Sequence, residues 1–402
     1  MLNNLTGNRP SSKLLEQKSL LQKAIKTNEP LASVLERASW TYHDLIYSRS
    51  FQRKWSGSAA LTLDEFDSTP TGVPVVSFFA GCGGIDLGLE AVGYRHVAAF
   101  ELNEMFCKTL RRNRPKWNVF GPPSHNGDVS DFDDVKSTLS PIIKAPFEGL
   151  FVGGPPCQPF SIASNQRFPK SADTFKRVGF SHQTNGNLLF DYINLIVEFR
   201  PMAFVIENVP GLRDIDGGVQ LQSAIDELEA AGYTIQEPFV LNAADYGVPQ
   251  QRFRLFIIGS RSSQPYEKPR PLVNRIGAGS VLQTLNAKLA NTETREHKAE
   301  SVMRYMELSY GERDQMGRVD RLDPLSPSKT VIAGGTKGGG RSHLHPEVPR
   351  TLSVRECARL QSFPDDYEFV GTSGRQFTQV GNAVPPVLAA QIGKSILRSF
   401  FE

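Results

Sequence analysis

Between residues 75 and 259, short apolar runs alternate with stretches in which apolar residues recur every three or four positions. The short runs end at glycine or polar residues, as buried strands do, and the longer stretches have the period of amphipathic helices. The expected strands are Val75–Phe79, His96–Glu101, Gly149–Val152, Met202–Glu207, Phe239–Leu241 and Leu255–Ile258, and the expected helices are Asp86–Val92, Phe106–Arg112 and Leu221–Leu228. This alternation predicts an α/β fold with a doubly wound, mostly parallel sheet covered by helices on both faces.

The regular α/β pattern is flanked by segments of a different kind. The N-terminal part shows two helical patterns, the first with Leu14, Leu21 and Ile25 on one face. After Gly259 the pattern dissolves for a length too great for one loop, which predicts a smaller second domain. The predicted parts are a helical extension at 1–70, the α/β domain at 71–259, the smaller domain at 260–349, and a C-terminal part at 350–402 with helices near Val354–Gln361 and Val387–Leu397.

Charge is unevenly distributed along the chain. The 402 residues carry a net charge of +3, whereas the segment from Ser260 to His345 has 14 Lys and Arg against 9 Asp and Glu. The remainder is therefore slightly acidic, and a basic segment on such a body indicates that one region grips a polyanion. The alternative is a solvated surface that happens to be basic.

The cysteines and the hydropathy pattern narrow the class of protein. The four cysteines lie far apart and none forms a CxxC pair, so zinc and dithiol sites have no support. We expect a reduced, cytoplasmic setting. The first thirty residues lack the apolar core of a secretory signal, and no apolar run approaches the ~18 residues of a membrane span.

One cysteine stands where a ligand would bind. Cys157 follows Pro155-Pro156 and the short strand that ends at Val152, so it is expected at the carboxyl end of that strand. Open α/β sheets bind ligands at this edge, and two consecutive prolines hold the thiol in place. Cys157 is therefore a candidate nucleophile, the alternative being a buried structural cysteine.

A glycine-rich turn and two acids suggest a nucleoside site. Phe78-Phe-Ala-Gly-Cys-Gly-Gly84 joins a strand to a helix, where glycines let a ligand approach the backbone. The turn lacks the GxGxxG pattern, so a pyrophosphate is not indicated. Glu101 at the next strand end suits ribose hydroxyls, and Asp128 suits an adenine amino group. Alternatively, the glycine-rich turn binds nothing.

A second acid and two arginines belong to the same expected edge. Glu207 ends a buried strand, where a carboxylate needs either a raised pKa or a specific partner. The alternatives are a helix N-cap or a surface acid. Arg252 and Arg254 lie on one face of a strand by alternation, which suits recognition of an anion or a carbonyl group.

Taken in order, these motifs resemble the DNA (cytosine-5) methyltransferase family of the bacterial restriction–modification type. The likeness covers about residues 75–259 and 350–397. The motifs are FAGCGG, the strand-end Glu101, GD at 127–128, GGPPCQPFS at 153–161, ENVPG at 207–211, QxRxR at 250–254, RECARLQSFPD at 355–365 and QVGNAVPP at 379–386. The resemblance implies a Rossmann-like methyltransferase fold with a target-recognition domain at 260–349.

The resemblance also implies catalytic roles. Cys157 would add to C6 of a flipped-out cytosine, so that C5 can take the methyl group of S-adenosylmethionine. Glu207, kept neutral by burial, would supply a proton at N3. Arg252 would stabilise the charge on the C2 carbonyl group. Arg254 would be its companion, holding either Glu207 or the loop of Cys157, and the base for the C5 proton would be a water.

Cofactor contacts are carried over from the family by motif. Leu102 departs from the pattern, since many members have a tryptophan after the strand-end acid, and stacking on the adenine would be weaker. The implied S-adenosylmethionine contacts are Phe79, Gly81, Gly83, Gly84, Glu101, Leu102, Asp128, Val129, Pro156, Leu188, Asn382 and Ala383.

DNA contacts are expected around the base and in the basic segment. The loop from Ser161 to Gly186 would close over the flipped base, but it is longer than usual and has Thr184-Asn185-Gly186 where an arginine-bearing turn is common. The candidate DNA-binding residues are Gln158, Ser161, Lys170, Lys176, Arg177, Lys337 and Arg341. The implied partner is double-stranded DNA. We expect a monomer without membrane contact, and any cognate restriction endonuclease would act independently.

Two other functions remain open on the sequence. A similar catalytic domain could methylate cytosine in transfer RNA, although the basic 260–349 segment and the extension argue against this. A catalytically silent DNA-binding regulator is the other alternative, and the intact Cys157, Glu207 and Arg252 argue against it.

Overall fold

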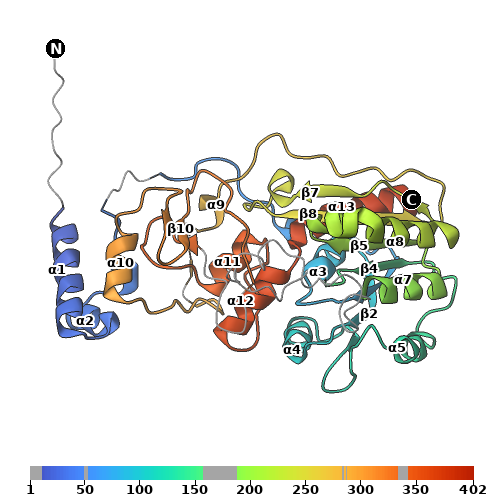
Figure 1. Cartoon of the computed structure of the whole chain (residues 1–402), viewed down its shortest axis with the longest axis horizontal. Coiled ribbons are helices and arrows are strands. Elements are labelled where there is room, and N and C mark those ends of the chain that lie inside the picture. Colours follow the sequence, from blue (N-terminus) through green and yellow to red (C-terminus); the bar gives the residue numbers. More distant parts are fainter. Residues whose placement is uncertain (1–10, 49–52, 157–187, 283–284, 287, 334–342) are drawn as a thin grey trace, which may run out of the picture.

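A computed structural model describes residues 11–48, 53–156, 188–282, 285–286, 288–333 and 343–402. Its centre is an eight-stranded sheet in the order β3-β2-β1-β4-β5-β8-β6, with β7 also paired to β8 (Figure 1). The strands are β1 Pro74–Phe78, β2 Arg95–Phe100, β3 Val119–Phe120, β4 Leu150–Gly153, β5 Ala203–Asn208, β6 Thr234–Ile235, β7 Phe239–Asn242 and β8 Phe253–Ser260.

The expected mostly parallel sheet is confirmed. Strands β1 to β5 pair in parallel, whereas β8 runs antiparallel to β5, β6 and β7. The amino end of β8 therefore lies at the same edge as the carboxyl ends of β1 to β5. This reversal brings QxRxR, at the start of β8, to the edge where ENVPG ends β5.

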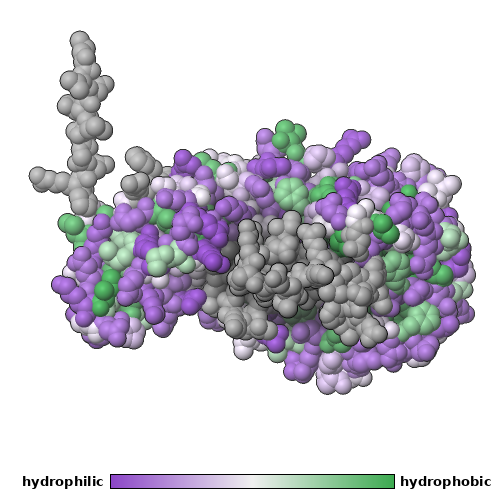
Figure 2. Space-filling view, viewed as in Figure 1, coloured by the Kyte–Doolittle hydropathy of each residue, from purple (hydrophilic) through white to green (hydrophobic). Residues whose placement is uncertain are grey.

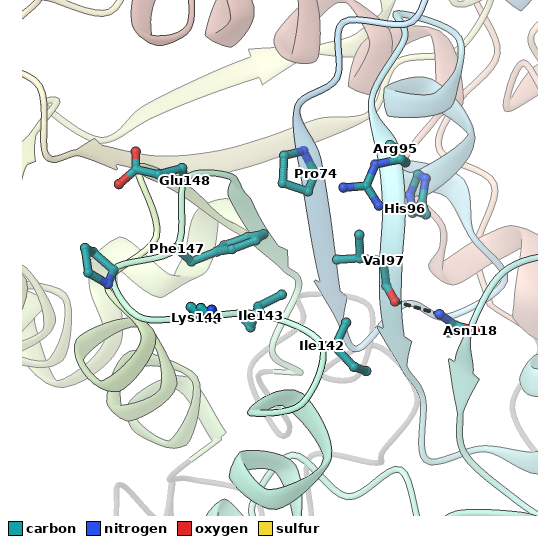
Figure 3. Close-up of a pocket in the computed structure, with 11 residues that line it drawn as sticks. Pro74, Arg95, His96, Val97, Asn118, Ile142, Ile143, Lys144, Phe147 and Glu148 are labelled. Carbon is teal, nitrogen blue, oxygen red and sulfur yellow. Dashed lines mark hydrogen bonds between the residues drawn. The ribbon is translucent and has the colours of Figure 1, made fainter.

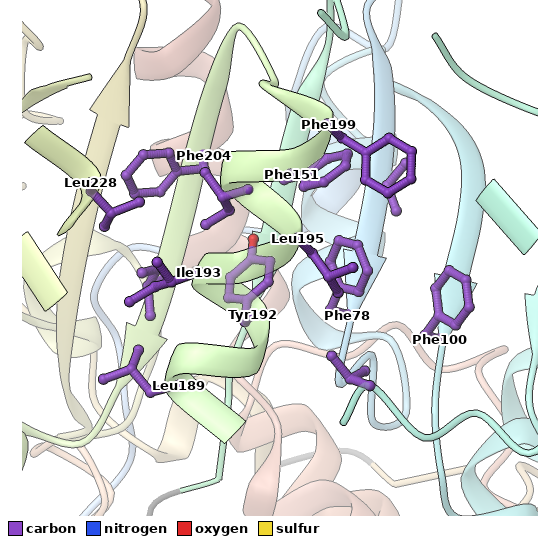
Figure 4. Close-up of a cluster of buried hydrophobic side chains, with 14 of the residues drawn as sticks. Phe78, Phe100, Phe151, Leu189, Tyr192, Ile193, Leu195, Phe199, Phe204 and Leu228 are labelled. Carbon is purple, nitrogen blue, oxygen red and sulfur yellow. The ribbon is translucent and has the colours of Figure 1, made fainter. Parts of the chain in front are cut away.

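Alternation along the strands sends side chains into two cores. On β4, Phe151 faces one core while Leu150 and Val152 face the other. The first core is covered by helices α5 (Phe132–Leu139), α7 (Leu188–Phe199) and α8 (Val219–Ala230), and Figure 4 shows side chains of α7 packed on the strands. The second is covered by α3 (Gly84–Glu90) and α13 (Pro386–Phe400). Helices thus cover both faces, as a parallel sheet requires.

Helix α13 joins the sheet from the far end of the sequence. It packs against α3, and the contact is close because Gly88 has no side chain. A Cβ atom at Gly88 would lie 2.4 Å from the carbonyl oxygen of Pro386 and 2.6 Å from Cβ of Ala389. A glycine is therefore needed where the two helices touch. Helix α4 (Glu104–Asn113) packs separately, with Cys107 and Leu110 in a small core beside Ala99.

A second body is built from residues after β8. It contains the sheet β11-β10-β9, formed by β9 Arg313–Asp314, β10 Val319–Arg321 and β11 His343–Leu344. Its core joins α9 (Gly279–Leu282), α11 (Val354–Leu360) and α12 (Ser373–Asn382) with Cys82 and Leu87 of the first body. Within it, Arg350 donates two hydrogen bonds of 2.8 Å to the buried carboxylate of Glu356.

The N-terminal segment packs on this second body. Helices α1 (Ser12–Thr27) and α2 (Leu31–Arg37) share an apolar cluster with α10 (Ala299–Tyr305), as Figure 1 shows at its left side. Tyr47 and Tyr310 enclose the buried guanidinium group of Arg321, 3.5 and 3.9 Å from the two ring centroids. The apolar face predicted for the first helix, α1, was partly wrong, since Ile25 is 38% exposed while Gln17 and Ala24 are buried.

On the face drawn in Figure 2, hydrophilic side chains predominate and apolar ones are scattered. None of the helices in the described residues has the length and apolar character that crossing a membrane requires.

Candidate active site

An acid and a guanidinium group meet at the carboxyl edge of the sheet. Glu207 is the penultimate residue of strand β5, and Nε of Arg254 lies 2.7 Å from its Oε1. Both side chains are largely buried, at 11% and 13% exposure. Burial raises the pKa of Glu207, although the charges of Arg254 and Arg252 oppose the shift. The carboxyl group of Glu207 is therefore protonated more readily than that of a surface acid.

The turn before Cys157 is held against the same strand. The Asn208 side-chain amide donates a 3.1 Å hydrogen bond to the Pro155 carbonyl oxygen. Gly154 passes close to the acid, because a Cβ atom there would lie 2.9 Å from Oε2 of Glu207. The chain thus reaches Pro156, which is exposed, from a point beside the Glu207 carboxyl group. Cys157 itself lies outside the described residues.

The two arginines occupy different environments. Arg254 contacts Glu207, one of the two placements that the sequence analysis left open. Arg252 is 1% exposed, and its terminal nitrogens donate to the carbonyl oxygens of Val331 at 3.1 Å and Gly381 at 2.8 Å. The expected role of Arg252 at a substrate carbonyl group therefore does not fit its surroundings. Its guanidinium group ties β8 to the second body instead.

The glycine-rich turn adopts conformations that few side chains tolerate. Phe79, Gly81 and Gly83 have φ angles of 53°, 58° and 83°. The backbone N–H of Gly81 donates a 2.7 Å hydrogen bond to Oε2 of Glu101, and the N–H of Asn103 donates one of 2.7 Å to Oε1. Burial raises the pKa of Glu101, opposed by these hydrogen bonds. Glu101 thus links the glycine-rich turn after β1 to the residues that follow β2.

The other residues expected at the cofactor surround this turn. Leu102 is 62% exposed, although it is apolar, and Val129 is buried. Oδ1 of Asp128 accepts hydrogen bonds from Ser130, and no partner is described for Oδ2. Leu188 begins α7.

The final motif lies against the first one. A Cβ atom at Gly84 would be 2.3 Å from the Val384 carbonyl oxygen and 3.1 Å from Cβ of Ala383. Asn382, the last residue of α12, is exposed. The structure therefore brings together two motifs that are about three hundred residues apart in sequence.

Several predicted site residues cannot be placed. They are the candidate DNA-binding residues of the sequence analysis. Gln158, Ser161, Lys170, Lys176, Arg177, Lys337 and Arg341 lie outside the described residues.

Some polar residues of this edge were missed from the sequence. Asp191 lies in the first turn of α7, and its pKa is raised by burial and by the charge of nearby Asp128. No helix was predicted there, so its position had no sequence signal. Asn103 caps α4 by accepting from the N–H groups of Met105 and Phe106. An asparagine just before a helical pattern is a recognisable cap and could have been found.

A separate cavity lies at the opposite edge of the sheet. Its volume is about 440 Å³, and Pro74, Arg95 and Lys144 are among the lining residues drawn in Figure 3. Pro74 begins β1, Arg95 begins β2 and Lys144 precedes β4, so the cavity opens at the amino ends of the strands. It is therefore remote from Glu207 and forms no part of the candidate active site.

Comparisons with known proteins agree with this geometry. The family model of the C-5 cytosine-specific DNA methylases matches residues 73–398. The Type II methyltransferase M.PspPI of Psychrobacter sp. is 35% identical over 353 residues, covering 81% of this chain and 79% of the relative. M.Eco47II of Escherichia coli is 33% identical over 355 residues, covering 80% and 78%.

Solved structures show the same fold. A crystal structure described as a DNA modification methyltransferase encoded within a prophage (E. coli) superposes with a TM-score of 0.67 at 24% identity, over 82% of this chain and 100% of that one. The Entamoeba histolytica methyltransferase EhMeth gives 0.57 at 14% identity, over 81% and 98%. The chain belongs to the C-5 cytosine-specific DNA methylase family, and its activity is DNA (cytosine-5) methylation.

Proposed function

We propose that the protein methylates C5 of a flipped-out cytosine within a specific duplex DNA sequence, using S-adenosylmethionine and a transient bond between Cys157 and C6. The carrying observation is the buried contact of Glu207 with Arg254, directly beside the turn that leads to Cys157. It supplies, at one point of the sheet edge, a proton donor and a cation next to the expected nucleophile.

The chain's residues fit the proposed cofactor, which supplies an electrophilic methyl group when bound. Each carboxylate oxygen of Glu101 accepts one backbone hydrogen bond, which leaves acceptor capacity for ribose hydroxyl groups. Oδ2 of Asp128 is available for an amino group. The exposed Leu102 offers an apolar surface to a base. A small aliphatic side chain would grip the adenine less firmly than an aromatic ring.

Glu207 is suited to protonate N3 of the cytosine. Addition of a thiolate to C6 places electron density on the ring, and a proton at N3 neutralises it. Because burial raises its pKa, the carboxyl group can hold that proton near neutral pH. When the C5 proton has left to a water, the C6–sulfur bond breaks and N3 returns its proton.

Arg254, in place of Arg252, is the residue we assign to the C2 carbonyl group. The guanidinium group has five N–H donors, and only the contact with Glu207 and one bond to the Phe253 carbonyl oxygen are described. Donors remain for a substrate oxygen at the same edge. Arg252, with its terminal nitrogens bonded to Val331 and Gly381, instead maintains the position of β8.

Trapping with a fluorinated base tests the covalent step. A fluorine at C5 cannot leave as a cation, so a duplex with 5-fluorocytosine at the target should leave the protein bound to DNA after methyl transfer. Cys157→Ser should still bind the duplex but form no adduct. A wild-type protein that methylates DNA without forming the adduct would disprove the role of Cys157.

The proposed setting is a restriction–modification system, supported by the Type II methyltransferase names of the relatives. We further propose that the enzyme acts as a monomer and independently of any endonuclease. Labelled methyl transfer to duplex DNA and to transfer RNA separates the DNA role from the RNA alternative. Bisulfite sequencing of DNA from cells that express the protein should identify the methylated cytosine, whereas a silent regulator would bind DNA without modifying it.

A further inference from the structure

Two cations share one buried carboxylate in the second body. Asp320 of strand β10 is 3% exposed. Its oxygens accept hydrogen bonds from Nη1 of Arg313 at 3.0 Å and from Nζ of Lys329 at 2.9 Å. The cationic side chains are themselves 43% and 63% exposed. The acid is thus inside the protein while both cations reach the surface.

The group carries an excess of positive charge. One carboxylate cannot neutralise two cations, and the other acids nearby are engaged elsewhere. Asp314 is paired with Arg304, and Asp323 with Arg53. Asp320 therefore orients two exposed cations and leaves a net charge of about +1 for a ligand from outside.

The position of Lys329 connects this charge to the active-site edge. Its neighbours are bound to the residues just before β8. The N–H of Gln251 donates to the Ser328 carbonyl oxygen at 2.8 Å, and the Thr330 hydroxyl donates to the Gln251 carbonyl oxygen at 2.7 Å. The Val331 N–H donates to Gln250 at 2.7 Å. Lys329 is therefore held beside Gln251, which precedes Arg254 by three residues.

The chemistry of the pair suits a phosphodiester. A guanidinium group offers a planar fork of donors and an ammonium group offers a point charge, and both bind phosphate oxygens. Pre-orientation by Asp320 lowers the loss of side-chain freedom on binding. A lone surface lysine has no such buried carboxylate to orient it.

We propose that Arg313 and Lys329 together bind one DNA phosphate on the recognition side of the active-site edge. The inference deepens the proposed function, on which it rests for the identity of the polyanion. The contact is to the backbone, so it should position the duplex without reading its sequence.

The salt dependence of DNA binding tests this contact. Lys329→Gln should reduce the slope of log K against log salt by about 0.9, the value for one lost phosphate contact on duplex DNA, for cognate and non-cognate duplexes alike. Lys329→Arg should restore it. The rate at saturating DNA should stay within about twofold of wild type, with the loss seen in KM, because a positioning contact acts in ground and transition states alike.

Lys144→Gln is the matched control, since this exposed lysine lines the cavity at the opposite edge of the sheet (Figure 3). It should leave the slope unchanged. An equal slope for wild type and Lys329→Gln, in proteins with the same thermal midpoint, would overturn the inference. If wild type forms the fluorocytosine adduct, that result removes only the phosphate contact. If wild type neither forms the adduct nor binds DNA, the proposed function and this inference both fail.

Discussion

Glu207 is subject to two opposing influences. Burial raises the pKa of its carboxyl group, whereas Arg254 at 2.7 Å favours the charged form. The net shift is upward, which suits an acid that must donate a proton and then recover it. A simple ion pair at the surface would hold the carboxylate ionised and could not perform this role.

Replacement of Glu207 by glutamine removes the transferable proton while keeping the shape of the side chain. We expect Glu207→Gln to lower the single-turnover methylation rate by ~10²–10⁴, the range for a positioned acid. In the wild type, the rate should fall as pH rises through the raised pKa, because the neutral form is then lost. Glu229→Gln, an exposed acid on α8, is the control and should change nothing. A reduction below threefold would contradict the assignment.

The different surroundings of Arg252 and Arg254 predict different mutant phenotypes. Arg252→Met should strand two buried carbonyl oxygens and lower the free energy of unfolding by about 1–3 kcal/mol for each. Arg254→Met should cost less stability but abolish most turnover. Urea unfolding and single-turnover rates, measured on both variants, separate the two effects. If the two variants lost similar stability and Arg254→Met kept full activity, the assignment of Arg254 to the C2 carbonyl group would be refuted.

Sequence reasoning could place both arginines on one edge but not divide their roles. Alternation along a strand gives the face of a side chain, whereas the partners of Arg252 are carbonyl oxygens of Val331 and Gly381, far along the chain. Such partners have no local signal. By contrast, Glu207 was found because an acid ending a buried strand is costly and therefore conspicuous.

Most elements of the catalytic sheet follow from local pattern. The expected strand at Leu255–Ile258 is the centre of β8, and the expected helix near Val354–Gln361 is α11. Helix α7 was missed although Tyr192, Leu195 and Ile196 have the i, i+3, i+4 spacing of one buried face, because the apolar Phe190 and Val197 on the opposite side obscure the amphipathic period. The reversal of β8 was also missed, since strand direction depends on connections that hydropathy does not encode.

The contact between α3 and α13 predicts a strong effect at Gly88. Alanine there would place a methyl group within 2.6 Å of Ala389 and within 2.4 Å of a backbone oxygen, so the helices must separate. We expect Gly88→Ala to destabilise the protein by about 1–3 kcal/mol, the cost of overpacking. Thermal unfolding measures the loss. A second change, Ala389→Gly, should recover part of it, and no recovery would show that the backbone contact dominates.

At the scale of the whole molecule, the stability of the second body depends on two buried groups that become protonated at low pH. Burial lowers the pKa of His345 to about 4. Burial raises the pKa of Glu356, but the hydrogen bonds and charge of Arg350 outweigh it and lower that pKa to about 2. Both groups bind protons less readily in the folded state than in the unfolded state.

Stability should therefore decline as the solution is acidified. The contribution of His345 is present above its ordinary value of 6.5 and is lost as pH falls towards about 4. That of Glu356 is present above 4.5 and is lost towards about 2. Urea midpoints at pH 7, 5 and 4 should fall in that order, and His345→Gln should flatten the upper part of the curve. A midpoint that is constant from pH 7 to 4 would contradict the role of His345.

The order of the chain also constrains how the protein is made. One face of the catalytic sheet is closed by α13, which the ribosome synthesises only after the whole second body. Domains usually fold as units during synthesis, the first one first. Here the earlier unit must wait with an uncovered apolar face, so a nascent chain interrupted within the second body would leave no working catalytic half and would expose a surface that chaperones bind.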